Sequence, residues 1–313
     1  MEYVFWGSII ELAFFGLIFG IGLALAAKKF AVEVDPRVEK VLEILPNANC
    51  GACGYPGCSG FAKAVVAGEV PVTGCPVGGQ SVAEKIAAIL GVEVGEVEPM
   101  VAVAACSGGV RAKDKYEYDG IEDCRAAMVM GGGPKLCSYG CIGLGTCVEA
   151  CPFDALSMGP LGVPVTDFDK CTGCGICVDV CPTGVMKLVP KSQPVFVACN
   201  SKDPGVFVRK ACETGCISCF LCQKNCPKQA IKVVNNLAEI DYDKCDACGI
   251  CIMVCPTKVI LNKFPDVMKA NKGLPAAVPT NPDETKALLD EIKKKQAEAK
   301  KTSKKPSEKK GNN

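Results

Sequence analysis

The sequence CISCFLCQKNCP, at residues 216–227, places four Cys at the spacing C-x2-C-x2-C-x3-C and follows the last with Pro. Residues 171–182 and 245–256 repeat this spacing. It is typical of [4Fe–4S] binding, in which three Cys of a tight loop bind one cluster and the fourth binds its neighbour. Zinc sites use separated Cys pairs instead. The three runs therefore predict paired clusters bound by Cys171, Cys174, Cys177, Cys181, Cys216, Cys219, Cys222, Cys226, Cys245, Cys248, Cys251 and Cys255.

A related but irregular run precedes them. Its ligand candidates are Cys137, Cys141, Cys147 and Cys151, and Pro again follows the last. The interval from Cys151 to Cys171 nearly equals that from Cys226 to Cys245, which indicates that one cluster-binding unit is duplicated. In this alignment Leu144 stands where the second unit has Cys219. One ligand of the first cluster must therefore come from elsewhere.

A separate set near the N-terminus has the spacing C-x2-C-x4-C-x16-C. It consists of Cys50, Cys53, Cys58 and Cys75. Three Gly within this stretch, Gly51, Gly54 and Gly57, allow the backbone to wrap closely around a bound group. Ligation by Cys alone suits a structural zinc ion as well as a cluster. The neighbouring cluster motifs favour a cluster here too.

The four other Cys are Cys106, Cys124, Cys199 and Cys212. The duplication matches Cys106 with Cys199 and Cys137 with Cys212, and it leaves Cys124 without a counterpart. In a first partition, Cys106, Cys137, Cys199 and Cys212 share an extra cluster while Cys124 replaces the ligand missing at Leu144. In a second partition, Cys137 fills that gap and Cys124 joins the extra cluster. Symmetry favours the first, and a third interpretation keeps these Cys as buried free thiols.

The amino-acid composition excludes several classes of metal and cofactor site. The 313 residues include 24 Cys and no His, which excludes Rieske centres, His-ligated haem and Cys2His2 zinc fingers. The sequence has no Gly-rich phosphate or dinucleotide motif, so we predict no catalytic residue and no nicotinamide or flavin site. A net charge of +1 gives no signal for nucleic acid. Repeated runs of four closely spaced Cys also argue against a secreted disulfide framework.

An apolar segment, Tyr3 to Ala27, is long enough to cross a membrane as one helix, with Glu11 as its single charge. Lys28 and Lys29 follow it, and no Lys or Arg precedes it. The positive-inside rule predicts a single span in the cell inner (cytoplasmic) membrane, with the cluster domains on the cytoplasmic side. Reduced Cys suit that compartment.

The second unit resembles a bacterial two-[4Fe–4S] ferredoxin. Between its motifs, residues 230–245 predict a hairpin that turns at Asn235 and Asn236. The crossed ligation of that family implies one set of Cys216, Cys219, Cys222 and Cys255, and another of Cys226, Cys245, Cys248 and Cys251. In the first unit, the same crossing adds Cys151 to Cys171, Cys174 and Cys177.

The whole arrangement resembles the Rnf complex's B-type subunit family over roughly residues 1–262. The resemblance rests on the apolar N-terminal segment, on PNANCGACGYPGCSGFAKAVVAGEV at 46–70, on CPVGG at 75–79 and on the duplicated units. It implies a membrane-bound ferredoxin:NAD oxidoreductase coupled to Na⁺ or H⁺ translocation. In that family, the B-type protein takes electrons from soluble reduced ferredoxin and passes them to flavin- and NAD-binding partner subunits. The chain would then be part of an enzyme without a complete active site of its own.

We therefore expect an α+β chain with at least five [4Fe–4S] clusters, and six if the remaining Cys bind one. The expected parts are a transmembrane anchor (1–29), an N-terminal 4Fe–4S domain (30–100), two ferredoxin-like blocks (101–190 and 191–262) and a Lys-rich disordered tail (263–313). Helices are predicted over 32–45, 81–90 and 283–299, and a link over 93–103. Two other functions fit less well: a polyferredoxin subunit of a membrane hydrogenase, and a membrane-tethered zinc scaffold or nucleic-acid binder.

Overall fold

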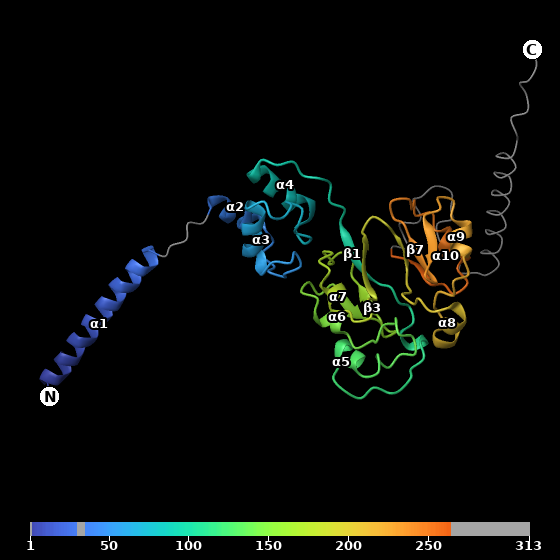
Figure 1. Ribbon diagram of the computed structural model, residues 1–313, viewed down its shortest axis with the longest axis horizontal. Coiled ribbons are helices and arrows are strands. Elements are labelled where there is room, and N and C mark those ends of the chain that lie inside the picture. Colours follow the sequence, from blue (N-terminus) through green and yellow to red (C-terminus); the bar gives the residue numbers. More distant parts are fainter. Residues whose placement is uncertain (1, 30–34, 264–313) are drawn as a thin grey trace, which may run out of the picture.

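The computed structural model describes residues 2–29 and 35–263 (Figure 1). The N-terminal segment forms one helix, α1 (Glu2–Lys29). Within it, Ile10–Lys29 has a mean hydropathy of 2.2, and none of this stretch is buried by the rest of the chain. Its length and composition suit a membrane span. The predicted helix over 283–299 and nearly all of the Lys-rich tail lie outside the described residues.

Three helices form the domain that follows: α2 (Pro36–Ile44), α3 (Gly57–Val66) and α4 (Gly79–Leu90). Asp35 caps the start of α2, because its carboxylate accepts a hydrogen bond from Arg37 N–H at 2.8 Å. One apolar side chain from each helix, Val41, Phe61 and Ile86, is almost fully buried in a shared core. The core therefore fixes the loops between the helices, which carry Cys50, Cys53 and Cys75, and the start of α3, which carries Cys58.

The two blocks repeat one strand pattern. In the first block, β1 (Met100–Ala104) pairs with β4 (Met186–Pro190), and β2 (Leu156–Met158) pairs with β3 (Pro164–Thr166). In the second, β5 (Val195–Val197) pairs with β8 (Ile260–Asn262), and β6 (Ile231–Val234) pairs with β7 (Leu237–Ile240). All four pairings are antiparallel. In each block the first strand pairs with the last and closes the unit.

Two details of these strands were predicted with different success. The hairpin turn at Asn235 and Asn236 is confirmed, because both residues have positive φ, as a two-residue hairpin turn requires. The predicted link over 93–103 is wrong at its end, because residues 100–104 form β1. Val101 and Val103 of β1 are buried against Val189 of β4, so pairing with a strand distant in the sequence orders this segment.

Short helices begin close to the Cys of each motif in the sequence, and Figure 1 shows them along the two blocks. They are α5 (Cys124–Val129), α6 (Thr146–Glu149), α7 (Ile176–Asp179), α9 (Leu221–Asn225) and α10 (Ile250–Val254); the 3-10 turn η1 (Gly109–Arg111) and α8 (Gly205–Ala211) complete the set. Backbone hydrogen bonds also join the blocks: Ser107 N–H donates to Ala198 O at 3.0 Å, and Lys113 N–H donates to Ala211 O at 2.8 Å. This junction adjoins Cys106, Cys199 and Cys212.

Candidate cluster-binding sites

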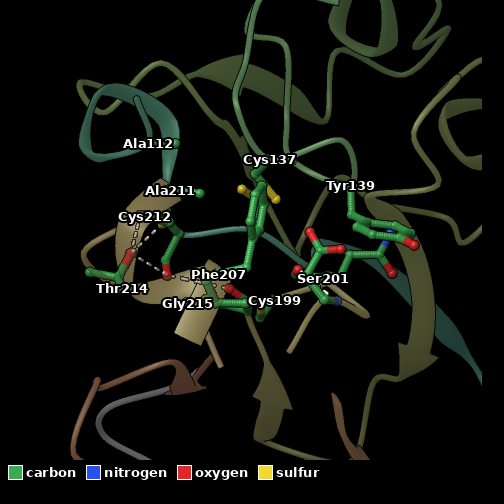
Figure 2. A pocket seen from close by; sticks show the side chains of 18 residues that line it. Ala112, Cys137, Tyr139, Cys199, Ser201, Phe207, Ala211, Cys212, Thr214 and Gly215 are labelled. Carbon is green, nitrogen blue, oxygen red and sulfur yellow. Dashed lines mark hydrogen bonds between the residues drawn. The ribbon is translucent and has the colours of Figure 1, made fainter. Parts of the chain in front are cut away.

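The bridging site lies between the two blocks. Its cavity, with an empty volume of about 420 Å³, is lined by Cys106 and Cys137 from the first block and Cys199 and Cys212 from the second (Figure 2). A Cβ atom at Gly108 would come within 3.2 Å of Cys212 Sγ and 3.5 Å of Cys106 Sγ, so the backbone of Gly108 passes close to these sulfurs. This grouping is that of the first partition.

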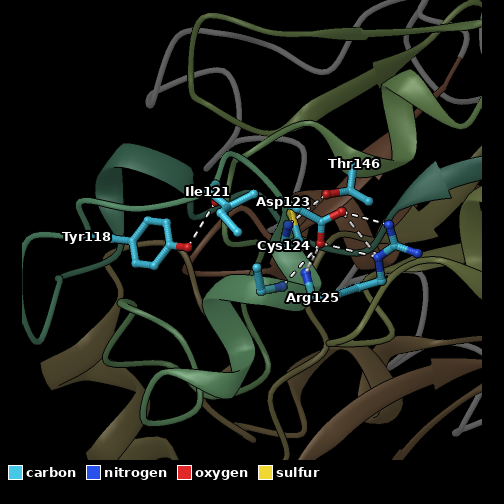
Figure 3. Close-up of polar contacts among 7 residues, drawn as sticks. Tyr118, Ile121, Asp123, Cys124, Arg125 and Thr146 are labelled. Carbon is cyan, nitrogen blue, oxygen red and sulfur yellow. Dashed lines mark hydrogen bonds and ion pairs between the residues drawn. The ribbon is translucent and has the colours of Figure 1, made fainter.

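The Cys124 site is the irregular site of the first block. A cavity of about 370 Å³ is lined by Cys124, Cys141, Cys147 and Cys181. Cys124 opens α5, whose cap is Asp123, and Cys124 N–H donates to Thr146 Oγ1 at 2.7 Å (Figure 3). Leu144 is not among the residues that line the cavity. The structure thus brings Cys124, rather than Cys137, to the position where Leu144 leaves a ligand missing.

The N-terminal site has a cavity of about 330 Å³, lined by Cys50, Cys53, Cys58 and Cys75. Asn49 orders its loop, because Asn49 Oδ1 accepts a hydrogen bond from Cys58 N–H at 2.8 Å. A Cβ atom at Gly57, whose φ is +79°, would lie 2.8 Å from the same oxygen. Both the backbone conformation and the position of Asn49 therefore favour glycine here.

Two sites have the crossed arrangement that the ferredoxin resemblance implies. The Cys171 site is a cavity of about 320 Å³ lined by Cys151, Cys171, Cys174 and Cys177. The Cys245 site is a cavity of about 360 Å³ lined by Cys226, Cys245, Cys248 and Cys251.

The Cys216 site consists of Cys216, Cys219, Cys222 and Cys255. Cys216, Cys222 and Cys255 belong to one buried cluster of side chains. Burial raises the pKa of Cys222 to about 11, and the charges of the other three thiols of the site contribute to this increase. Cys219 is the only one of the 24 Cys, all of which lie in the described residues, that is exposed. This site therefore meets the molecular surface.

The cavities suit a cluster better than a single ion. Among residues 2–29 and 35–263, no three His, Cys, Asp or Glu side chains lie close enough together to bind one metal ion. Zinc would need its thiolates to converge at about 2.3 Å from one point. An iron–sulfur cubane takes one thiolate at each of its four irons, so its ligand sulfurs are spread around a larger group than a single ion.

Neighbouring sites are close enough for their thiols to affect one another, beginning at the N-terminal end. Burial raises the pKa of Cys174 in the Cys171 site, and charge on Cys50 of the N-terminal site raises it further. Burial likewise raises the pKa of Cys177 to about 12, with a contribution from Cys147 of the Cys124 site. Because such interactions weaken with distance, these three sites are neighbours in that order.

The same reasoning extends the row into the second block. Burial raises the pKa of Cys141 to about 12, and Cys106 of the bridging site adds to the shift. At the bridging site, Cys199 Sγ accepts a hydrogen bond from Cys216 N–H at 3.3 Å. Burial also raises the pKa of Cys251 in the Cys245 site, with a contribution from Cys222. The row therefore runs from the N-terminal site through the Cys171, Cys124, bridging and Cys216 sites to the Cys245 site.

Sequence reasoning missed a group of hydroxyls beside the sulfurs. Thr183 Oγ1 lies 3.7 Å from Cys181 Sγ, and the same distance separates Thr257 Oγ1 from Cys255 Sγ and Thr214 Oγ1 from Cys212 Sγ. Two of these Thr follow a regular motif in the sequence, because Cys-Pro-Thr occurs at 181–183 and at 255–257.

Comparisons with known proteins agree with the cluster motifs. Residues 45–77 match a family described as "Putative Fe-S cluster". Residues 140–185 match a 4Fe–4S dicluster domain, and residues 216–230 and 238–261 match 4Fe–4S binding domains. These matches confirm the predicted α+β chain of an N-terminal apolar helix, an Fe–S domain and ferredoxin-like 4Fe–4S domains.

Full-length relatives identify the family, and all three described here are the B-type component of their complex. The chain is 48% identical over 261 residues to the B-type subunit of the ion-translocating oxidoreductase complex of Methanosarcina acetivorans. The match covers 83% of this chain and 99% of the relative. It is 50% identical over 250 residues to the B-type subunit of the Na⁺-translocating ferredoxin:NAD⁺ oxidoreductase complex of Acetobacterium woodii. The match covers 80% of this chain and 75% of the relative. It is 48% identical over 256 residues to the B-type subunit of the proton-translocating ferredoxin:NAD⁺ oxidoreductase complex of Clostridium ljungdahlii. The match covers 80% of this chain and 90% of the relative. The chain therefore belongs to the B-type subunit family of the ion-translocating ferredoxin:NAD oxidoreductase, or Rnf, complexes.

Proposed function

We propose that this chain carries electrons from reduced ferredoxin, through six [4Fe–4S] clusters, to flavin- and NAD-binding subunits of a membrane complex that moves Na⁺ or H⁺. The observation that carries the proposal is the row of six four-Cys sites, which uses all 24 Cys of the sequence. Clusters of this type supply one-electron transfer when bound. The protein then acts as a relay rather than as a catalyst of bond formation.

The proposed ligand sets are the six groups of sulfurs around the sites. The N-terminal, Cys171, Cys216 and Cys245 sites each hold one cluster with the ligands named above. In the Cys124 site, Cys124 stands in for the ligand missing at Leu144. Each set consists of four thiols and includes no His or carboxylate ligand, which suits an iron–sulfur cluster.

The bridging site makes the relay continuous across the two blocks. Its four Cys come equally from both blocks, and the Cys216 amide donates to Cys199 Sγ. Without a cluster here, the Cys124 site and the Cys216 site would be separated by an unfilled cavity. We propose that Cys106, Cys137, Cys199 and Cys212 bind the sixth cluster.

Electrons enter at the second block and leave toward the membrane. Supporting this direction, Cys219 is the exposed Cys of the row, so the Cys216 site is accessible to a soluble donor. The N-terminal site is the end of the row that comes next in the chain to α1, and the Cys216 site lies one place in from the opposite end. Lys28 and Lys29 at the end of α1 favour a cytoplasmic location for all six sites.

A single substitution at the bridging site tests this function. Membranes containing the whole complex with Cys137→Ser are compared with wild type for NAD reduction by reduced ferredoxin. The variant should lose at least about 90% of this activity, a tenfold effect equivalent to about 1.4 kcal/mol, while reduced ferredoxin still bleaches the second-block clusters. Unchanged NAD reduction in a variant that lacks one cluster would contradict the relay.

A further inference from the structure

One sequence position differs among the six sites in a systematic way. The position lies two residues after one ligand Cys of each site, namely Cys75, Cys151, Cys181, Cys212, Cys255 and Cys226. This position holds Thr in the Cys124, bridging and Cys216 sites and a residue without a hydroxyl in the N-terminal, Cys171 and Cys245 sites. The residues are Val77, Phe153, Thr183, Thr214, Thr257 and Lys228.

The three Thr hydroxyls contact ligand sulfurs. Each Oγ1 lies 3.7 Å from the Sγ of the Cys two residues before it. A thiolate bound to iron carries no proton, so the hydroxyl must donate and the sulfur must accept. Thr183 and Thr257 have no other hydrogen-bond partner for this hydroxyl among the interactions of the described residues, whereas Thr214 Oγ1 also lies 3.1 Å from Ser107 O.

The bridging site has a second hydroxyl, because Ser201 also lines its cavity. Ser201 is only 2% exposed, so this hydroxyl is shielded from bulk water. The bridging cavity therefore has a hydroxyl besides that of Thr214.

Backbone amides do not distinguish the sites in this way. Ala102 N–H donates to Cys171 Sγ at 3.4 Å, and Ala230 N–H donates to Cys226 Sγ at 3.3 Å, so sites that lack the Thr have amide contacts too. At the Cys245 site a carboxylate is also close, because Asp246 Oδ1 accepts from Cys248 N–H at 3.3 Å. Negative charge there opposes the addition of an electron.

We propose that Thr183, Thr214 and Thr257 raise the reduction potentials of three consecutive sites, so that electrons collect in the middle of the row rather than at its ends. The inference rests on the proposed relay function. A reduced site carries one more negative charge than an oxidised one, and a hydroxyl donated to sulfur stabilises that charge. The Cys124, bridging and Cys216 sites are adjacent, so the three hydroxyls act on one uninterrupted segment.

Redox titration of the purified full-length protein tests this inference. The titration is monitored by EPR and uses dithionite and dye mediators. In Thr183→Val, one midpoint should fall by about 59 mV, which is a tenfold change for one electron. Thr183→Ser keeps the hydroxyl and should titrate like wild type. Thr257→Val should lower a different midpoint by a similar amount.

Thr166 provides the matched control, because its buried hydroxyl contacts no sulfur and has no hydrogen-bond partner within the described part of the chain. Thr166→Val should leave every midpoint unchanged. The proposal is overturned if neither Thr183→Val nor Thr257→Val shifts a midpoint, or if Thr183→Ser shifts it as far as Val does. Because the titration needs no ferredoxin, failure of ferredoxin to reduce the wild type would contradict the proposed function and leave this result standing.

Discussion

At the scale of single residues, Cys124 shows how a distant segment can complete a motif. Asp123 Oδ1 accepts hydrogen bonds from Arg125 N–H at 2.6 Å and Ala126 N–H at 3.2 Å, which fixes the first turn of α5. Thr146 Oγ1, from α6, accepts from Cys124 N–H. These contacts hold the Cys124 thiol beside Cys141, Cys147 and Cys181, although α5 lies outside the regular motif.

Cys124→Ser should therefore remove the cluster of the Cys124 site alone. Iron content should fall from about 24 to about 20 per chain, because each cubane contains four iron atoms. Cys137→Ser is the matched control, since it should remove the same amount of iron from the bridging site but change a different EPR signal. Identical spectral changes in the two variants would contradict the assignment of Cys124 and Cys137 to separate sites.

At the scale of structural elements, the loop before α3 depends on one close contact. Asn49 Oδ1 accepts from Cys58 N–H, and Gly57 leaves room for that oxygen. Gly54 also has a positive φ, of +84°, but a Cβ atom there would meet nothing within 4 Å. The two glycines thus separate the effect of backbone conformation from the effect of crowding.

Gly54→Ala should cost about 1–3 kcal/mol of stability from the positive φ alone. Gly57→Ala should cost more, by about 0.5–1.5 kcal/mol, because Asn49 must move and the Cys58 hydrogen bond is lost. The measurement is the thermal midpoint for loss of cluster absorbance, followed by iron analysis. Equal effects in the two variants would show that crowding at Asn49 is unimportant.

Lys263, at the end of the second block, contacts the first block. Its Nζ donates to Pro190 O at 2.7 Å and lies 5.8 Å from the centre of the Phe168 ring. Burial lowers the pKa of Lys263 to about 8, although the charge of Glu98 opposes this shift. Since the pKa in the unfolded chain is near 10.5, the unfolded chain binds more protons between pH 8 and that value. Stability therefore increases as pH rises through this window.

Lys263→Met should remove this dependence. The difference between the thermal midpoints of wild type and variant should increase in favour of wild type between pH 8 and pH 10. Each kcal/mol gained in the free energy of unfolding should raise the wild-type midpoint by about 2–4 °C. Comparing the two proteins at each pH cancels the titration of other groups. A constant difference across this range would contradict a lowered Lys263 pKa.

At the scale of the whole molecule, local motifs were predictable and long-range contacts were not. The runs at 171–182, 216–227 and 245–256 and the turn at Asn235 and Asn236 are encoded by neighbouring residues, so the sequence sufficed for them. The choice between Cys124 and Cys137 depends on how α5 packs against α6, and β1 forms only when it meets β4. Thr183 was overlooked because a hydroxyl two residues from a Cys has no meaning until the distance to sulfur is known.

Removing residues 1–29 should release the protein from membranes without loss of clusters. No part of the Ile10–Lys29 stretch is buried by the rest of the chain, and the six sites use residues from Cys50 onward. Fractionation of cells and iron analysis of the truncated protein provide the check. Loss of iron, or continued membrane association in the absence of the other subunits, would contradict the role of α1 as the anchor.

The most direct measurement of the central claim is the iron and acid-labile sulfide content of the anaerobically purified full-length protein. Six sites that use all 24 Cys predict about 24 iron and about 24 sulfide per chain, at four of each per cubane. A content of about 20 of each, with the Cys of the bridging site free to react with a thiol reagent, would contradict a continuous row of six clusters.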